Sequence, residues 1–433
     1  MAKKSNKMAD AAKKRPKLAA AIAVILVLIV VAAVIFCIVR HDLVHKYVGL
    51  FDHTWGDWTV VREADCGDGS RERKCLYCDA DESEIIKGSG NHVLGEDGIC
   101  AVCGFNGNSA ELSVHFLELG NKYTGDCTLI KCGDTEVLID AGSRKNSAAT
   151  IKSYVDKYCT DGKLEYVIAT HAHQDHIAGF VGNKEGDSRT GILYQYEVGT
   201  LIQFAGHKSE TAIYDEYCDA VEYAKGKGTA VYTAKECRQQ TDGAKYKYYL
   251  DEAQTVELTI LDSHFYYNAT DDENDYSVCV LLTQKSGGET YNYLFTGDLE
   301  KEGESYLVEM NDLPQVDLFK GGHHGSYTAS TEKLLEVIKP KNVAVCCCCG
   351  TTEYTTNAEN TFPAQAFIDR VSKHTENIYC TTLIVDYKNG LYESMNGNIV
   401  FYAKNGELIA DCSNNNVILK DTEWFKKNRK WKA

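Results

Sequence analysis

Four potential metal ligands stand within six positions of one short segment of the chain. The segment reads His171-Ala-His173-Gln-Asp175-His176 and follows the apolar run of residues 164–169. Imidazole nitrogens and a carboxylate suit Zn²⁺, and also Mn²⁺ or Fe²⁺. His171 and His173 project from one turn and can share one ion, while Asp175 and His176 follow at a helix start and can serve a second. A solvated polar loop does not explain this density of ligands, so we expect a dinuclear metal centre.

Further segments with chemical side chains flank this one in a recognisable order. Leu138-Ile-Asp140-Ala-Gly precedes it, and Phe295-Thr-Gly-Asp298 follows it. Together they resemble the signature of the metallo-β-lactamase superfamily. The resemblance implies an α/β fold, the four-layer αββα sandwich, in which Asp298 bridges two metals and Asp140 orients the metal loop. It also implies a hydrolase that uses a metal-activated hydroxide.

A closer resemblance rests on the segment Lys320-Gly-Gly-His323-His324-Gly-Ser326, which comes shortly after Thr296-Gly-Asp298. With the upstream Thr124-Gly-Asp-Cys-Thr-Leu-Ile130, it is similar to the hydrolase domain of ComEC-type competence proteins. Those proteins also have a multi-spanning channel, whereas this chain has one apolar span, so we do not expect a role in DNA uptake. The family often has Gly-His-Pro where this chain has Asn360-Thr-Phe-Pro363. The second metal site therefore has one histidine fewer than the family pattern, or its ligation shifts to His323 or His324.

The predicted site follows from these segments. We expect Asp175 and His324 to be the catalytic groups. Of the adjacent pair His323 and His324, either one could ligate a metal ion or lie beside the substrate. Lys320 or Ser326 could contact a phosphate, although a solvated strand end is the commoner role for such a lysine. The expected metal ligands are His171, His173, Asp175, His176, Asp298 and His323. The expected cofactor is Zn²⁺, with two ions per site, or alternatively Mn²⁺.

The net charge of the chain restricts the class of substrate that it can bind. The formal net charge is −16, and residues 1–17 carry seven Lys/Arg and one Asp, so the tail contributes +6 and the rest −22. Such an acidic body does not resemble a general polyanion binder, and bound cations must offset its field if it acts on phosphates. We expect a phosphodiester substrate, either nucleic acid or nucleotide. The alternatives are a hydrolase of lactams, lactones or thioesters, and a catalytically weak surface binding protein. No stable protein partner is predicted.

Residues 18–39 contain no charged side chain and are long enough to cross a membrane as one helix. The basic residues 1–17 precede this span, so the positive-inside rule places the N-terminus in the cytoplasm and the catalytic domain outside the cell. A cleaved signal peptide is the alternative, but the apolar run is too long and lacks an A-x-A site. We therefore expect a single-pass signal anchor in the cell membrane.

Residues 51–104 form a separate cysteine-rich module. Cys75-x-x-Cys78 and Cys100-x-x-Cys103 have the spacing of a zinc ribbon, in which two knuckles hold one tetrahedral ion. His53, Cys66 and His92 are spare candidate ligands. The module is too short to build much of a core, so zinc or disulfides must hold it. Disulfides remain open because the compartment is outside the cytoplasm.

The remaining pattern predicts the elements that position the site. Residues 110–404 alternate apolar strands with helices, and residues 405–433 add a hairpin strand and a basic-aromatic tail. Gly133-Asp134 is a strong hairpin turn between two strands. Four successive cysteines, residues 346–349, occupy an apolar run. Because strand side chains alternate faces, four neighbours cannot chelate one ion, and we expect a buried core strand.

Overall fold

The computed structural model describes residue 31 and residues 53–62, 69–78, 80–86, 111–186, 188–286, 288–404 and 406–432. The chain divides into a small unit, Met1–Val93 with Ala101–Cys103, and a large unit, Leu94–Cys100 with Gly104–Ala433. Among the described residues, no helix has the length and apolar character needed to span a membrane. The predicted span, residues 18–39, lies outside the described residues apart from Val31, and so do Cys100 and Cys103.

The small unit contains one antiparallel sheet with the strand order β1-β2-β3. Opposite charges face each other across β2 and β3, where Arg71 pairs with Glu84 and Arg73 with Glu82. These exposed pairs fix the register more than they stabilise the sheet. The strands are β1 (Thr59–Arg62), β2 (Gly69–Lys74) and β3 (Asp81–Ile86).

The first sheet of the large unit has eight strands in the order β11-β10-β7-β6-β5-β4-β20-β21. β5 and β6 form the predicted hairpin, and Gly133 takes the left-handed conformation that its turn needs, with φ +56°. β6, β7, β10 and β11 are parallel to one another. The strands are β4 (Leu112–Phe116), β5 (Thr128–Cys132), β6 (Thr135–Ile139), β7 (Lys163–Ala169), β10 (Glu197–Gln203), β11 (Ala230–Thr233), β20 (Ile399–Lys404) and β21 (Glu407–Cys412).

The second sheet also has eight strands, in the order β12-β13-β14-β15-β16-β17-β18-β19. Its centre is parallel and its flanks are antiparallel. The cysteine run lies in β17 and is buried throughout, so the prediction of a core strand is confirmed. The strands are β12 (Lys247–Tyr249), β13 (Val256–Ile260), β14 (Val280–Ser286), β15 (Glu289–Phe295), β16 (Leu318–Lys320), β17 (Asn342–Cys349), β18 (Ile378–Asp386) and β19 (Leu391–Ser394).

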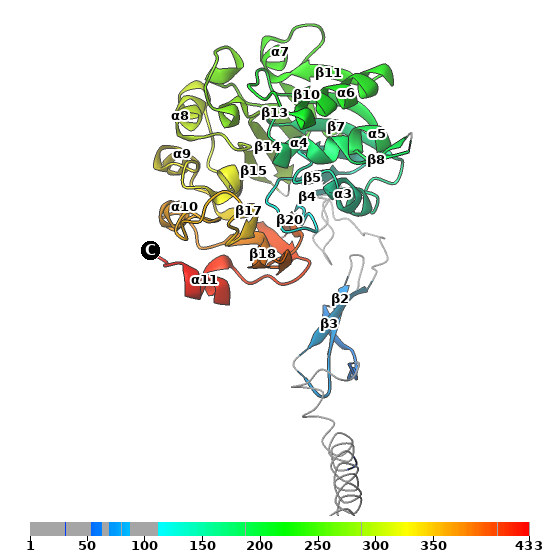
Figure 1. The fold of residues 1–433 in the computed structure, drawn as a ribbon, viewed down its shortest axis with the longest axis vertical. Helices are drawn as coiled ribbons and strands as arrows, with labels where there is room; N and C mark the ends of the chain where they lie inside the picture. The colour runs from blue at the N-terminus through cyan, green and yellow to red at the C-terminus, as the bar shows by residue number, and fades with distance from the viewer. Residues whose placement is uncertain are drawn as a thin grey trace, which may run out of the picture. The chain divides into compact units, whose positions relative to one another are not determined.

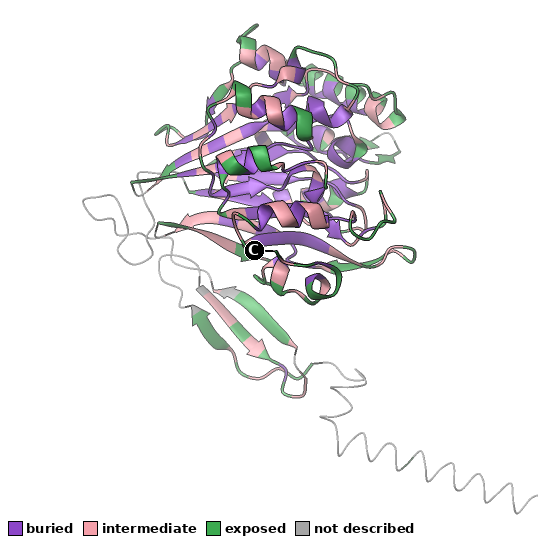
Figure 2. Ribbon diagram, turned by 90° about the vertical axis from the view of Figure 1, so that its left-hand side faces the viewer, coloured by how far each residue is buried: buried purple, intermediate pink, exposed green. Residues whose placement is uncertain are grey.

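Helices cover both sheets, which gives four layers (Figure 1). One buried cluster joins the facing sheets to α3 and α4, and within it the rings of Phe116 and Phe295 lie 6.2 Å apart. A second cluster joins the second sheet to α8, α9 and α10. The strands between the helix layers are mostly buried (Figure 2). The helices are α3 (Ser147–Val155), α4 (Gln174–Val181), α5 (Ile192–Gln195), α6 (Ala212–Gly226), α7 (Ala234–Gln239), α8 (Lys301–Met310), α9 (Glu332–Ile338), α10 (Gln365–Val371) and α11 (Glu423–Asn428).

Two further segments bear on the site. The residues before β14, which begins at Val280, are tied to the end of β7, because the Val278 amide donates to the Thr170 carbonyl at 2.9 Å. The C-terminal tail also packs into the large unit. Its buried Arg429 donates to the carbonyls of Thr361 and Pro363.

Candidate metal centre

The segment with four predicted ligands joins β7 to α4, and we call residues 170–176 the metal loop. β7 ends at Ala169, and α4 begins at Gln174, so Asp175 and His176 lie in its first turn. The His171 Nε2 and His173 Nδ1 atoms lie 3.1 Å apart. Ligands of one tetrahedral zinc ion are separated by roughly 3.3 Å when each Zn–N bond is about 2.05 Å. These two nitrogens are therefore placed to share one cation, and burial lowers the pKa of His171 well below its ordinary value, which keeps its imidazole neutral.

Asp140 holds the metal loop from the end of β6. Its Oδ1 accepts from the Thr170 amide at 2.8 Å, and its Oδ2 lies 2.7 Å from both Thr170 Oγ1 and His176 Nδ1. The backbone of Asp140 has φ +59°, a left-handed conformation that aspartate tolerates better than most residues. Asp140 thus fixes the ring of His176 and leaves its Nε2 facing the site.

The second sheet contributes Asp298 from the loop that follows β15. Its Oδ2 lies 3.1 Å from His176 Nε2 and 3.1 Å from His324 Nε2. Its amide donates to Ser277 Oγ at 3.1 Å, which anchors the loop. Burial opposes ionisation of Asp298, but His176 and His324 outweigh it and hold the pKa of Asp298 well below its ordinary range. One carboxylate oxygen therefore faces histidines from both sheets.

The adjacent histidines point in different directions. They follow β16 in a tight turn, where His323 has φ +46° and His324 has φ +53°. His324 is buried, with Nδ1 3.0 Å from both the Cys346 carbonyl and Asp126 Oδ1. The side chain of His323 is 21% exposed, and its Nδ1 lies 3.0 Å from Glu300 Oε1. Its Nε2 is 3.8 Å from Asp298 Oδ2, so His323 lies at the rim and His324 inside.

Asp126 and Lys320 belong to the site but were not among the predicted ligands. Lys320 is buried, so the expectation of a solvated strand end is wrong. Its Nζ pairs with Asp126, lies 3.4 Å from Asp298 Oδ1 and donates to the Gly297 carbonyl at 3.0 Å. Burial opposes protonation, but the two carboxylates outweigh it and raise the pKa of Lys320. Asp126 and Asp298 each end a Thr-Gly-Asp triplet, a signal that could have drawn attention to Asp126.

The buried donor set fits a divalent cation. One ligand atom each from Asp126, His176, Asp298 and His324 lies within 4.8 Å of the other three. The His324 Nε2 atom is buried and makes no directed hydrogen bond. Burial opposes protonation of His176, but Asp298 and Asp140 outweigh it and raise its pKa to about 10. The field that favours a proton there also favours a metal ion, and nitrogen with carboxylate oxygen suits zinc or manganese.

The histidine of the family's Gly-His-Pro segment has no counterpart in this sequence, and other side chains lie around Asp175. The hydroxyl of Tyr354 donates to Asp175 Oδ2 at 2.6 Å, and His324 Nε2 lies 3.4 Å from the same oxygen. Phe362, from the segment that replaces Gly-His-Pro, packs its ring 5.7 Å from the ring of His324. A tyrosine and a phenylalanine therefore surround the position where a further ligand was sought.

A cavity of about 1370 Å³ opens beside His173, a half-buried member of the metal loop. Glu273 forms part of its wall and accepts hydrogen bonds from the amides of Ala172 and Lys208, so it also braces the metal loop. The charged residues that line the cavity are mostly acidic: Glu210, Asp271, Asp272, Glu273, Asp275, Glu300 and Glu302, against Lys208 and Lys301. This wall repels an extended polyanion.

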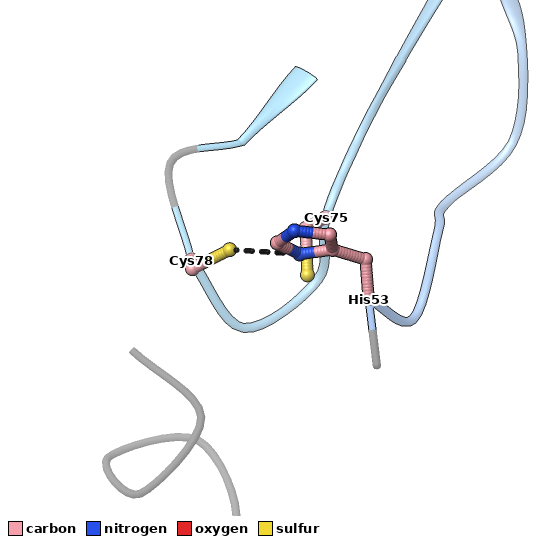
Figure 3. Close-up of side chains that lie close together, drawn as sticks. All are labelled: His53, Cys75 and Cys78. Carbon is pink, nitrogen blue, oxygen red and sulfur yellow. Dashed lines mark hydrogen bonds between the residues drawn. The ribbon is translucent and has the colours of Figure 1, made fainter. Parts of the chain in front are cut away.

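The small unit brings two of its predicted cysteines together with a histidine. Cys75, Cys78 and His53 each place a ligand atom within 4.8 Å of the other two (Figure 3). Cys100 and Cys103, which were predicted to complete this set, lie outside the described residues.

Comparison with known proteins places the large unit. Residues 120–185, which contain the metal loop, match the family model of the metallo-beta-lactamase superfamily. ComE operon protein 3 of Bacillus subtilis (strain 168) is 26% identical over 184 residues, which are 42% of this chain and 20% of that protein. The chain thus spans about a fifth of the length of this curated relative. Residues 120–185 of the large unit are thus similar to the metallo-β-lactamase superfamily, and 42% of the chain is similar to part of a ComE operon protein.

Solved structures with similarity to the chain include metallo-β-lactamases. BJP-1, a subclass B3 enzyme of Bradyrhizobium japonicum, is 17% identical with a TM-score of 0.24, over 42% of this chain and 61% of that one. MEM-A1, a subclass B3 enzyme from a soil metagenome library, is 12% identical with a TM-score of 0.28, over 50% of this chain and 82% of that one.

Proposed function

We propose that this chain is a metal-dependent hydrolase that cleaves phosphodiesters. The observation that carries the proposal is the position of Asp298 Oδ2, 3.1 Å from His176 Nε2 and from His324 Nε2, next to the paired nitrogens of His171 and His173. A carboxylate between two groups of histidines is suited to bridging two cations. A bound divalent cation would supply a nucleophile near neutral pH by lowering the pKa of water, and would polarise the bond under attack.

The side chains have distinct proposed roles. His171 and His173 would hold one cation, Asp175, His176 and His324 would hold the second, and Asp298 would supply a ligand to both. The rim histidine, His323, faces the cavity side with Glu300 and contacts the substrate. This reverses the roles first expected for His323 and His324, because His324 is the buried member of the pair. Asp140 orients His176 through its Nδ1 atom.

The choice of phosphodiesters rests on resemblance and on charge. The segment Gly321-Gly-His-His-Gly-Ser326 resembles the competence-protein hydrolases, and ComE operon protein 3 is a relative. The acidic cavity wall repels the many phosphates of a long nucleic acid. It admits a short one, because the metals would neutralise the charge of the phosphate at the site. We therefore favour nucleotides or short oligonucleotide ends. The alternatives are a carbonyl substrate such as a lactam, lactone or thioester, and a binding protein with little turnover, which the tyrosine on Asp175 would favour.

We further propose that residues 18–39 anchor the protein in the cell membrane and place the large unit outside the cell. The charge-free apolar run and the basic residues before it support this arrangement. Cysteine substitution at positions 10 and 210, followed by labelling of intact cells with an impermeant maleimide, tests the orientation. Position 210 should be labelled and position 10 protected, and the opposite pattern would contradict the proposal.

The test of function combines metal content with hydrolysis. Purified full-length protein should hold cations in the large unit and should cleave bis(p-nitrophenyl) phosphate faster than the lactam nitrocefin. His171→Ala/His173→Ala should lose metal and activity, while His374→Ala, which replaces a histidine in the turn after α10, should retain both. Wild-type turnover in the double variant would refute the assigned site. Faster nitrocefin cleavage would favour the carbonyl alternative, and metal binding without turnover would favour the binding protein.

A further inference from the structure

We infer that His53, Cys75 and Cys78 form a structural zinc site that holds the small unit together, with His53 as the third ligand. The inference is independent of the proposed hydrolase. Its starting observation is that His53 Nδ1 lies 3.4 Å from Cys78 Sγ, with Cys75 beside both (Figure 3). The zinc-ribbon spacing alone pointed to four cysteines and left His53 as a spare.

The distances suit a tetrahedral zinc ion. With a Zn–S bond of about 2.3 Å and a Zn–N bond of about 2.05 Å, two ligand atoms of one ion lie roughly 3.6 Å apart. The observed 3.4 Å between Cys78 Sγ and His53 Nδ1 is close to this separation, and all three ligand atoms lie within 4.8 Å of one another. Two thiolates and an imidazole form a donor set that favours zinc over the oxygen-seeking Mg²⁺ or Ca²⁺.

The backbone holds His53 in this position. Cys75 and Cys78 lie on a tight turn after β2, which the Cys75 amide closes by donating to the Ala80 carbonyl at 2.9 Å. The segment after His53 runs antiparallel to this turn, because the Leu76 amide donates to the Thr54 carbonyl at 2.8 Å and Trp55 bridges to Cys75. This backbone pairing holds the segment that carries His53 next to the turn that carries the two cysteines, which places the imidazole beside both thiols.

The small unit also needs a stabilising device other than a core. Among its residues whose burial the structure describes, Cys75 alone is buried. Its remaining contacts are on the surface, where Arg73 stacks over Trp58 at 4.5 Å and pairs with Glu82. Exposed ion pairs contribute about 0–1 kcal/mol each, which does not fold a unit of this size. A structural zinc ion contributes its binding energy directly to folding.

A closed structural site needs a fourth ligand, for which the sequence of the small unit supplies Cys66, His92 and Cys103. All three are outside the described residues, so the experiment below must identify the ligand.

Cobalt substitution distinguishes this site from the centre in the large unit. Thiolate ligands give Co²⁺ a charge-transfer absorption in the near ultraviolet, and the donor set proposed for the large unit contains no cysteine. Full-length protein should be purified under reducing conditions, stripped of metal and titrated with Co²⁺ and then Zn²⁺. We expect the thiolate band in the wild type, its displacement by added Zn²⁺, and its loss in Cys75→Ser and Cys78→Ser.

His53 is tested by substitution against matched controls. His53→Ala should weaken zinc binding at the thiolate site by more than about 100-fold, beyond the usual effect of losing an outer-sphere partner. His53→Cys should restore binding with a stronger thiolate band. Cys218→Ser, which removes an exposed thiol of α6, should leave the band unchanged. The series Cys66→Ser, His92→Ala and Cys103→Ser then locates the fourth ligand.

Two results would overturn the inference. A thiolate band that survives His53→Ala at wild-type affinity would remove His53 from the ligand set. Absence of the band, together with a mass showing Cys75 and Cys78 oxidised in protein prepared from its own compartment, would mean that disulfides hold the unit instead.

Discussion

Asp140→Asn is the substitution that tests most directly how the metal loop is held. Asp140 does not face the expected cations, but its Oδ2 lies 2.7 Å from His176 Nδ1 and 2.7 Å from Thr170 Oγ1. Asparagine has the same shape and tolerates the left-handed backbone at this position, where φ is +59°. It keeps an acceptor for the Thr170 amide but removes the negative charge beside His176. The change therefore isolates the charge from the geometry of the loop.

The expected magnitude follows from the role of such partners. A carboxylate behind a metal-binding histidine fixes the ring and increases the basicity of its other nitrogen, and its loss typically weakens metal binding about 10–100-fold. That range corresponds to about 1.4–2.7 kcal/mol of binding free energy. The free energy of unfolding of the metal-free protein should change by only about 1 kcal/mol, because one neutral hydrogen bond replaces a charged one.

The assay is a zinc titration against a chromophoric chelator, with circular dichroism to verify folding. Asp317→Asn is the matched control, because Asp317 is also buried and accepts the Asn292 amide at 2.9 Å, but it lies outside the site. We expect weaker zinc binding in the large unit for Asp140→Asn and unchanged binding for Asp317→Asn. An affinity within about threefold of wild type in a folded Asp140→Asn protein would refute the proposed orienting role.

Three further predictions concern packing, pH and the aspartate ligand. A Cβ atom on Gly142 would lie 1.5 Å from the Asp175 carbonyl oxygen. Gly142→Ala should therefore lower the free energy of unfolding, measured by urea titration, by about 3 kcal/mol or more. The control Gly226→Ala, where a Cβ atom would meet open space, should change it by less than about 1 kcal/mol. Burial lowers the pKa of His115 to about 3, while the unfolded chain titrates near 6.5. The unfolded chain then binds a proton that the folded chain does not, so stability should fall by roughly 1.4 kcal/mol per unit as pH drops below 6.5, and His115→Gln should flatten this slope. Tyr354→Phe removes the hydrogen bond to Asp175 and should weaken metal binding about 10-fold by the same chelator titration, and unchanged binding would exclude an orienting role.

The metal loop could be predicted from the sequence because its ligands are local. Four donors in six positions, after a buried strand and before a helix, leave few arrangements of the backbone, and the structure has His171 and His173 facing each other as expected. The hairpin at Gly133 and the buried cysteine strand followed from equally local rules. The hairpin depends on turn geometry, and the cysteine strand depends on the alternation of side chains between the two faces of one strand.

The parts of the site that were missed depend on long-range assembly. Asp126 and Lys320 come from opposite sheets and meet only when the two sheets pack together. The spacing of neighbouring histidines also cannot reveal which one is buried. That choice is made by a turn in which both His323 and His324 have positive φ, and no periodic rule describes such a turn.

The charges around Asp298 also explain why Lys320 is buried. Asp126, Asp140, Asp175 and Asp298 are all nearly inaccessible, and among the described residues Lys320 is the one buried lysine that pairs with any of them. One ammonium cannot balance four buried carboxylates, and burying unpaired charge costs several kcal/mol per group. The balance must come from protonated histidines or from bound cations. Lys320 compensates Asp126 and one oxygen of Asp298, which leaves the other oxygen of Asp298 for the histidine side, where the donor set fits a metal.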